Sequence, residues 1–336
     1  MKGAAWRVRS GPEHGGPVAR AIALALLLAL VGTGELAPAA ASQPPEGTEG
    51  HEGTRGADGR NLFEWTGVAP IVVAGTSLGE DGHHFDFQVT ASLRGDFAVG
   101  DELRIDVREA NRLRDRMLHP KALRLDEGID YVLLLEVAAP GGKHRLVRGV
   151  YGARELPLEG REAYLEALRA FIEIQDVPSE ELKWKRLTEL LGATNPLVIG
   201  TTLEEFLKFR RGEADLLLTL LPLLDHPQPP LRGDAARLIG QIVDRQREHG
   251  TTIDDDIVRA ELIARATRDE SVPVRVAATE ALAAFPPELV DSVLVDIAES
   301  DPEQQVRYAA QLVRLERKIS GTRENPPASA DPPPVD

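Results

Sequence analysis

The sequence predicts an α+β protein with two folded parts, a small antiparallel β-barrel followed by a short all-α stack of helical hairpins. Three observations predict it. Between residues 62 and 155, apolar and polar residues alternate with the period of half-buried strands. From residue 160 the apolar residues follow helical spacing almost to Lys318. Within the helical part, one pattern of apolar residues, alanine and arginine recurs.

Residues 1–41 are interpreted as a secretory signal peptide. Four basic residues precede the apolar run AIALALLLALVG, and the small residues APAAAS follow it, which predicts cleavage near Ala41. The run is shorter than the ~20 apolar residues of a membrane helix, so no stable membrane insertion is expected after cleavage. An uncleaved anchor is the alternative. The expected location is the periplasm or the exterior of a bacterium.

Charge and cysteine content exclude several functions. The formal net charge is −15, and removal of residues 1–41 makes it −17, because four basic and two acidic side chains are lost. Such a surface repels nucleic acid and anionic lipid. The chain has no cysteine, so it has no disulfide, no thiolate nucleophile and no cysteine for acylation.

Residues 42–61 are rich in Gly, Glu, Pro and Thr and predict a disordered linker. The segment 62–155 then predicts five strands, with one long interruption at 109–128. Closing such a set of strands into a barrel removes its exposed edges. The strand segments are VAPIVVAGTS, HFDFQVTASL, DELRIDVRE, YVLLLEV and RLVRGVYG.

The strand order and four segments resemble the OB-fold barrel of the netrin or TIMP-like type, which occurs in exported bacterial proteins. These segments are VVAGTS, FQVTASLRGDFAVGDELRIDV, DEGIDYVLLLEV and RLVRGVYG. The resemblance covers under a third of the chain. The cysteines that pin netrin-type modules are absent here, so the resemblance does not imply inhibitor activity.

In the helical part, 156–320, one spacing recurs. An apolar residue is followed by small or apolar residues four and eight positions later. The copies are Leu231, Ala235 and Ile239; Val274, Ala278 and Leu282; Val306 and Ala310; and, more weakly, Val198, Thr202 and Phe206. An arginine follows the first apolar residue in three copies, and an aspartate precedes that arginine by six or seven positions. These residues are Arg232, Arg275 and Arg307, with Asp225, Asp269 and Asp301.

The pattern resembles the HEAT repeat, a helical hairpin that buries its apolar faces by stacking on its neighbours. The resemblance implies alanines at the seams between repeats and aspartate–arginine pairs between successive repeats. It also explains the proline that begins several of the second helices, because the first turn needs no N–H at that position. The expected helix pairs are 180–209, 213–247, 254–285 and 287–319. The Pro-rich tail, 321–336, is expected to be disordered and solvated.

Two candidate sites for chemistry lie in the strand region. GTSLG matches the pattern of a nucleophile elbow around Ser77, but a strand rather than a helix follows it, so we interpret it as a hairpin turn. His84 and Asp86 share one face of a strand and would supply two of the ligands for a metal. A solvated polar face is the favoured interpretation. His119 and His144 are isolated, and the contiguous Asp254–Asp256 do not form a calcium loop.

A basic segment interrupts the acidic barrel sequence. It is a candidate patch for an acidic partner, and a solvated amphipathic segment is the favoured alternative. No aromatic residues accompany the basic ones, which argues against nucleic acid. The candidate patch residues are Arg112, Arg114, Arg116, Lys121 and Arg124.

The sequence therefore predicts an exported, non-catalytic protein that binds or scaffolds another protein. No catalytic residue, metal site or cofactor is assigned. The alternative is an extracytoplasmic enzyme or accessory subunit that uses the polar face of the barrel, with a metal at His84 and Asp86.

Overall fold

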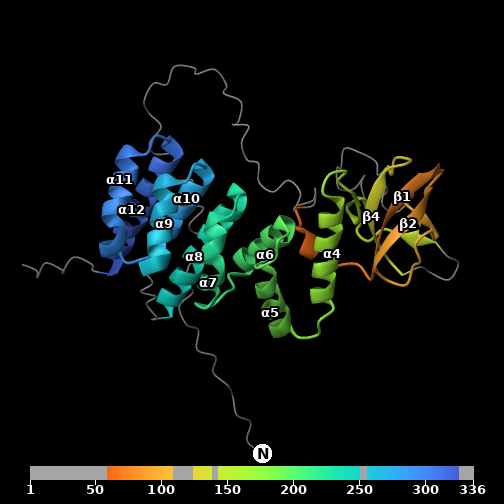
Figure 1. Cartoon of the computed structure of the whole chain (residues 1–336), viewed down its shortest axis with the longest axis horizontal. Coiled ribbons are helices and arrows are strands. Elements are labelled where there is room, and N and C mark those ends of the chain that lie inside the picture. The colour runs from red at the N-terminus through yellow and green to blue at the C-terminus, as the bar shows by residue number, and fades with distance from the viewer. Residues whose placement is uncertain (1–58, 109–123, 138–142, 250–255, 325–336) are drawn as a thin grey trace, which may run out of the picture. The chain divides into compact units, whose positions relative to one another are not determined.

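The computed structural model describes residues 59–108, 124–137, 143–249 and 256–324 (Figure 1). The strands are β1 (Ile71–Asp81), β2 (His84–Arg94), β3 (Glu102–Asp106), β4 (Asp130–Leu135), β5 (His144–Arg145) and β6 (Ala153–Glu155). The longer helices are α4 (Arg161–Gln175), α5 (Glu180–Leu190), α6 (Pro196–Phe209), α8 (Pro229–Glu248), α9 (Asp256–Arg268), α10 (Val272–Ala281), α11 (Pro287–Ser300) and α12 (Gln304–Glu324). The short helices are α2 (Leu62–Thr66) and α7 (Leu216–Leu220), with 3-10 turns at Gly149–Gly152, Leu221–Asp225 and Leu282–Ala284.

The six strands form one curled sheet in the order β5-β3-β2-β1-β4-β6. Neighbouring strands are antiparallel except β3 and β5, which are parallel. The chain around β5 also reaches β4, because the N–H of Glu136 donates to Arg145 O and the N–H of Val147 donates to Leu134 O, both at 2.9 Å. The segment at β5 therefore bonds to both β3 and β4, and the sheet curls into at least half a barrel.

Strand β4 and residues 71–75 of β1 are buried on both faces, which explains their continuous apolar sequences. On the concave face, Val73 and Leu133 pack with Phe85 and Phe87 of β2. On the convex face, neighbouring side chains of β1 and β4 pack against α2 and α4. This outer core includes Val72, Ala74, Val132, Leu134, Trp65, Leu165, Leu168 and Phe171. Strand β2 alternates because its other face is partly exposed.

Three local expectations for the strand region are wrong. The predicted turn at Ser77 lies inside β1, which continues to Asp81, and the chain reverses at Gly82, where φ is +68°. The segment RLVRGVYG is not one strand: after β5 it forms the 3-10 turn Gly149–Gly152, and then β6. Residues 62–66 form helix α2 rather than a strand, because the Asn61 side chain caps it by accepting from Glu64 N–H at 2.9 Å.

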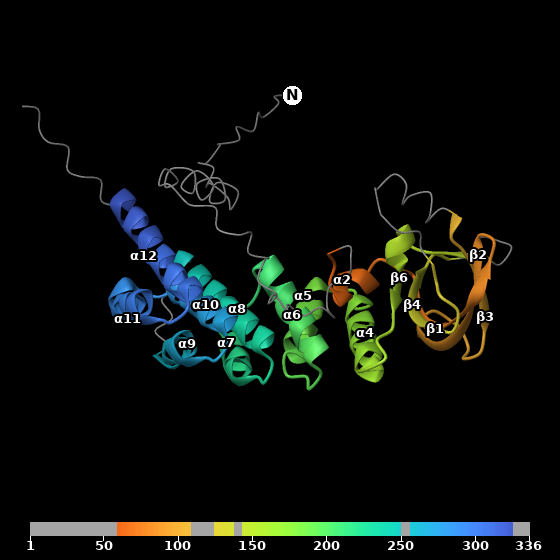
Figure 2. The same ribbon diagram turned by 90° about the horizontal axis from the view of Figure 1, so that it is seen from above.

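The expected helical hairpins are confirmed. They are α5 with α6, α7 and its 3-10 extension with α8, α9 with α10, and α11 with α12. Proline occupies the first turn of the second helices α6, α8 and α10, as the pattern predicts, and also that of α11, a first helix. Figure 2 shows the second helices α8, α10 and α12 side by side in one layer, with α9 and α11 in the other. None of the described helices combines the length and apolar content needed to cross a membrane.

The seam between α8 and α10 is tight at one glycine and open at another. A Cβ on Gly240 would lie 2.8 Å from the Cα of Ala281, whereas a Cβ on Gly233 would meet nothing nearer than 3.9 Å. Alanine normally stabilises a helix by ~0.5–1 kcal/mol relative to glycine. We therefore expect Gly233→Ala to stabilise the protein by that amount. Gly240→Ala should destabilise it by ~1–2 kcal/mol, because the two backbones must move apart. Urea unfolding of both variants measures the difference, and equal stabilisation would contradict so close a seam.

Candidate protein-interaction surface

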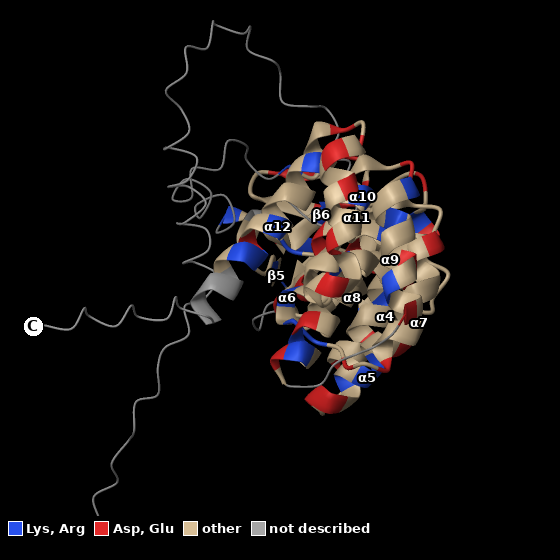
Figure 3. Ribbon diagram, turned by 90° about the vertical axis from the view of Figure 1, so that its left-hand side faces the viewer, with Lys and Arg blue, Asp and Glu red and all other residues tan. Residues whose placement is uncertain are grey.

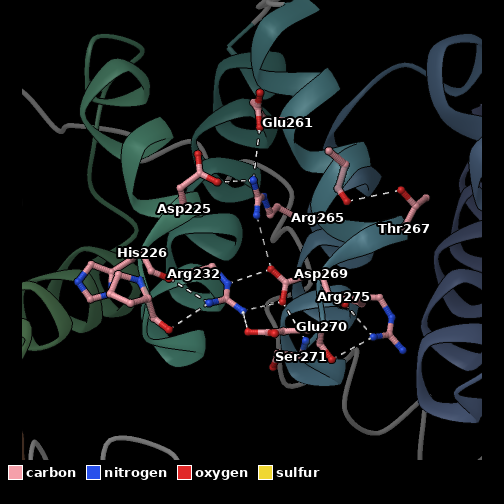
Figure 4. A network of polar contacts seen from close by, with 12 residues as sticks. Asp225, His226, Arg232, Glu261, Arg265, Thr267, Asp269, Glu270, Ser271 and Arg275 are labelled. Atoms are coloured by element: carbon pink, nitrogen blue, oxygen red, sulfur yellow. Dashed lines mark hydrogen bonds and ion pairs between the residues drawn. The ribbon is translucent and has the colours of Figure 1, made fainter.

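Two buried ion pairs connect successive hairpins, and Figure 4 shows the first of them, between Arg232 and Asp269. The guanidinium of Arg232, on α8, donates from Nε and Nη2 to the carboxylate of Asp269 at 2.9 and 2.8 Å. Arg275, on α10, repeats this one hairpin later, with Nε and Nη2 at 3.0 and 3.3 Å from the carboxylate of Asp301. The Asp269 carboxylate, through its hydrogen bonds, raises the pKa of Arg232. The expected arginine–aspartate ladder is therefore present at these two junctions.

Each ladder arginine also binds the turn that precedes its own helix. Nη1 of Arg232 donates to the backbone carbonyls of His226 and Pro227. In the same way, Nη1 of Arg275 donates to the backbone carbonyls of Asp269 and Glu270. One guanidinium thus holds its own turn and the aspartate of the next hairpin together. This geometry sets the register between neighbouring hairpins.

The aspartate assigned to the first copy is corrected by the structure. Asp225 lies outside the ladder, where its exposed carboxylate pairs with Arg265. His226 takes the ladder position instead: its Nδ1 accepts from the N–H of Gln228, two residues on, at 3.1 Å. Asp269 and Asp301 cap their turns in the same way, two residues on. Counting back six residues from each arginine would have found His226, because that spacing is constant in all three copies.

The ladder is structural and offers no binding site. The Arg232 and Asp269 side chains are 7 and 2 % exposed, and those of Arg275 and Asp301 are 9 and 6 % exposed. A partner has access instead to the outer side of the second helices. There Glu280 of α10 is exposed; partial burial of its carboxyl raises the pKa of Glu280, and the charges of Arg237 on α8 and Glu316 on α12 also act on it. We call these three residues the second-helix row.

The charge along the repeats is mixed. Figure 3 shows basic and acidic residues interspersed over α9, α10, α11 and α12 rather than gathered by sign. Such a surface suits a specific, polar protein contact better than binding to a polyanion.

On the polar face of the sheet, basic side chains lie beside His84 and Asp86, the two residues considered as metal ligands. Asp86 lies 4.0 Å from Nε of Arg104, its cross-strand partner. Nε2 of His84 lies 3.2 Å from Nζ of Lys143. In the described part of the chain, no group of three His, Asp or Glu side chains is placed to hold a metal. His144 packs edge-on against Phe97, and burial lowers its pKa.

The other candidate residues do not form a site. Ser77 is buried, and its hydroxyl donates to the carbonyl of Leu125 at 2.9 Å, so it is not displayed as a nucleophile. Of the basic patch, Arg112, Arg114, Arg116 and Lys121 lie outside the described residues, as does the Asp254–Asp255 stretch. Arg124 is described and exposed.

Sequence reasoning missed two polar connections to α2. Asn61, which caps α2, donates from Nδ2 to Oε1 of Glu205 on α6 at 2.7 Å in a buried contact. Arg94, at the end of β2, donates to the carbonyls of Thr66 and Ala69 at 3.0 and 2.8 Å. No local pattern signals these bonds, because they join residues far apart in the chain.

One buried carboxyl near the sheet edge makes stability depend on pH. The side-chain hydrogen bonds of Arg108 lower the pKa of Asp106 to about 2. Ionised Asp106 therefore stabilises the fold above about pH 4, the range of an unfolded aspartate, and this contribution is lost as the pH falls toward 2. We expect Asp106→Asn to destabilise the protein at pH 7, with a difference from wild type that shrinks steadily in urea titrations between pH 5 and 3. The exposed Asp96→Asn is the control; an equal pH trend there would contradict this assignment.

These features define a class of protein, a stack of helical hairpins joined by buried ion pairs and preceded by a curled β-sheet. Within it, residues 217–313 match the family of HEAT repeats. That match covers α8 to α11 and the ladder residues of three copies, and it confirms the resemblance for this part of the chain. A search of curated proteins finds no match to the chain.

Proposed function

We propose that the protein is exported and acts without catalysis, by binding another protein along the second helices of its HEAT-like stack. HEAT repeats are commonly protein-interaction modules, and the match to them carries this proposal. The second-helix row supplies exposed groups of both signs on adjacent helices, and the ladder holds those helices in fixed register. A rigid row of this kind binds a partner with little loss of conformational entropy.

The decisive experiment compares two charge reversals in the full-length chain. Glu280→Lys changes the second-helix row, and Glu299→Lys makes the same change on the exposed side of α11, in the other layer. Affinity capture from the extracytoplasmic fraction of the source cells should retain a protein with the wild type and with Glu299→Lys, but lose it with Glu280→Lys. Capture that is unaffected by both changes, or equally weakened by both, would refute the second-helix row as the binding surface.

Export is a separate part of the proposal. Its support is the order of basic, apolar and small residues in residues 1–41. We expect the mature chain to begin within a few residues of Ala41. N-terminal sequencing of the exported protein measures this, and an intact Met1 in the membrane fraction would show a retained anchor instead.

We further propose that the sheet is an OB-like barrel of the netrin or TIMP-like type. The support is its pairing: β1 with β2, β2 with β3, β3 parallel to β5, and the β5 segment back to β4. In barrels of this kind the connecting loops often form the binding face. The barrel would then give the protein a second contact region, which includes Arg124.

A further inference from the structure

One junction of the helical stack lacks the arginine–aspartate pair that joins the later hairpins. Each ladder arginine stands six residues after the capping residue of its own turn, and the same count from Asn195, the capping residue of α6, leads to Thr201. Oδ1 of Asn195 accepts from the N–H of Leu197, two residues on, at 3.1 Å, as the ladder aspartates do in their turns. Thr201 therefore takes the place of a ladder arginine, and His226 takes the place of the aspartate that such an arginine would bind.

The buried side of α6 also carries hydroxyls that make no hydrogen bond. Thr201 and Thr202 are fully buried, and neither Oγ1 has a partner within the described residues. An unpaired buried hydroxyl costs free energy, and most buried polar groups in folded proteins avoid that cost by pairing. Ile199 and Phe206 of α6 lie in the same apolar core as the helices that follow. This apolar packing is non-directional, so it does not fix the register of α6 against α8.

Polar bonds tie the helices on each side of this junction into two bodies. Toward the sheet, Nδ2 of Asn61, the cap of α2, donates to Oε1 of Glu205 on α6 at 2.7 Å. Nδ2 of Asn195 donates to the carbonyl of Ala163 on α4, also at 2.7 Å. On the other side, the two ladder pairs join the hairpins of α8, α10 and α12. The first body contains the sheet, α2 and α4 to α6, and the second contains α7 to α12.

Polar contacts join the two bodies where α6 and α8 end. The carbonyl of Arg210, which follows α6, accepts from Nη1 of Arg245 on α8. Nη2 of Arg210 lies 3.7 Å from the carboxylate of Asp244, and Nε2 of Gln246 donates to Glu213 at 3.1 Å. Thr201 and His226, by contrast, belong to the beginnings of the two helices. The junction is therefore held by ionic and hydrogen-bonding groups at one end and lacks a ladder pair at the other.

We propose that this junction is a hinge, about which the first body turns against the second. We call Thr201, His226, Arg210 and Asp244 the α6–α8 joint. Helices packed through apolar side chains shift by ~1–2 Å between alternative packings, and the contacts at Arg210 serve as the pivot. The other junctions resist such a shift, because an arginine that binds a carboxylate through two N–H groups fixes the geometry. The match to HEAT repeats begins at residue 217 and so lies wholly within the second, ladder-bound body.

The hinge allows the sheet and the second-helix row to change their relative position while each body keeps its own shape. It requires no partner, so it stands independently of the proposed function. Its basis is the pair of residues at positions 201 and 226, neither of which supplies the charge that the later junctions use.

The test uses the absence of cysteine from the full-length chain, which allows two spin labels at chosen places. Lys185→Cys with Ala260→Cys places labels on α5 and α9, across the joint and one ladder pair. Leu218→Cys with Ser292→Cys places them on α7 and α11, across two ladder pairs; all four side chains are exposed. Distance distributions from electron paramagnetic resonance should be wider for the first pair by about 2 Å or more, the scale of a helix shift. Equal widths, or a wider distribution for the second pair, would overturn the proposal.

Restoring the missing ladder pair should lock the hinge. In the protein labelled at positions 185 and 260, Thr201→Arg with His226→Asp should narrow the distribution to the width of the second pair. His226→Asp alone is the control: it keeps an acceptor for the N–H of Gln228 but provides no guanidinium, so the distribution should stay wide. A folded double variant whose distribution remains as wide as that of the control would contradict the hinge.

The converse change decides the matter even if an arginine at position 201 prevents folding. Arg232→Met with Asp269→Leu removes one ladder pair without leaving a buried charge unpaired. In the protein labelled at positions 218 and 292, it should widen the distribution by about 2 Å or more. An unchanged width would show that the ladder does not hold the hairpins in register, and the proposal would fail.

Discussion

Replacing Asp269 with alanine is expected to lower the free energy of unfolding by about 3–5 kcal/mol. The substitution leaves the Arg232 guanidinium buried, with its side chain 7 % exposed, and removes the carboxylate that faces its Nε and Nη2. It also removes the acceptor that caps Ser271 N–H at 2.9 Å. Urea unfolding monitored by circular dichroism measures the loss.

Asp225→Ala is the matched control for this prediction. By sequence Asp225 belongs to the same pattern, but its side chain is 69 % exposed and its pair with Arg265 lies at the surface. An exposed pair contributes only about 0–1 kcal/mol. Similar losses for the two variants would contradict the buried ladder. A double change of Arg232→Met and Asp269→Leu should recover much of the stability, because no unpaired charge then remains buried.

The second large effect is expected at Ala278. This residue is fully buried in the core shared by the hairpins, on the helix that packs against α8, α9 and α12. Ala278→Leu forces three more carbons into that seam, and we expect a loss of about 3 kcal/mol, at the upper end for overpacking. In a stack stabilised by nearest neighbours, hydrogen exchange should rise first in residues 217–313 and later in the sheet.

Glu280→Ala, two residues further along α10, supplies the comparison. Its side chain is exposed in the second-helix row, so the free energy of unfolding should change by less than about 0.5 kcal/mol. If the Ala278 and Glu280 variants were equally stable, or if Ala278→Leu loosened residues 62–155 first, the stacked packing of α10 would be refuted.

The helical hairpins could be predicted from sequence because their signals are local. Apolar residues at four-residue spacing define the buried face of α10, and Pro273 marks its first turn. Strand β2 could also be predicted from sequence, because its apolar residues alternate with polar ones. In the structure Phe85, Phe87 and Val89 all lie in the concave core. The turn at Ser77 was misplaced because an apolar run ends there and an alternating strand follows soon after. In the structure Gly75 instead lets β2 approach closely, as a Cβ there would lie 2.1 Å from Gln88 O.

By itself, the sequence determined the order of a strand region and four helical hairpins, and the repeat of arginine after the first apolar residue. Only the tertiary structure decided that the carboxylates of Asp269 and Asp301 are buried against Arg232 and Arg275 whereas that of Asp225 is exposed, and that β4 and residues 71–75 of β1 are covered on both faces. The physical reason is the separation along the chain of the residues that interact. Helical and strand periods arise between residues a few positions apart, whereas the ladder joins residues 37 and 26 positions apart. Which carboxylate a buried guanidinium meets depends on how neighbouring hairpins pack, and that packing is a property of the assembled core.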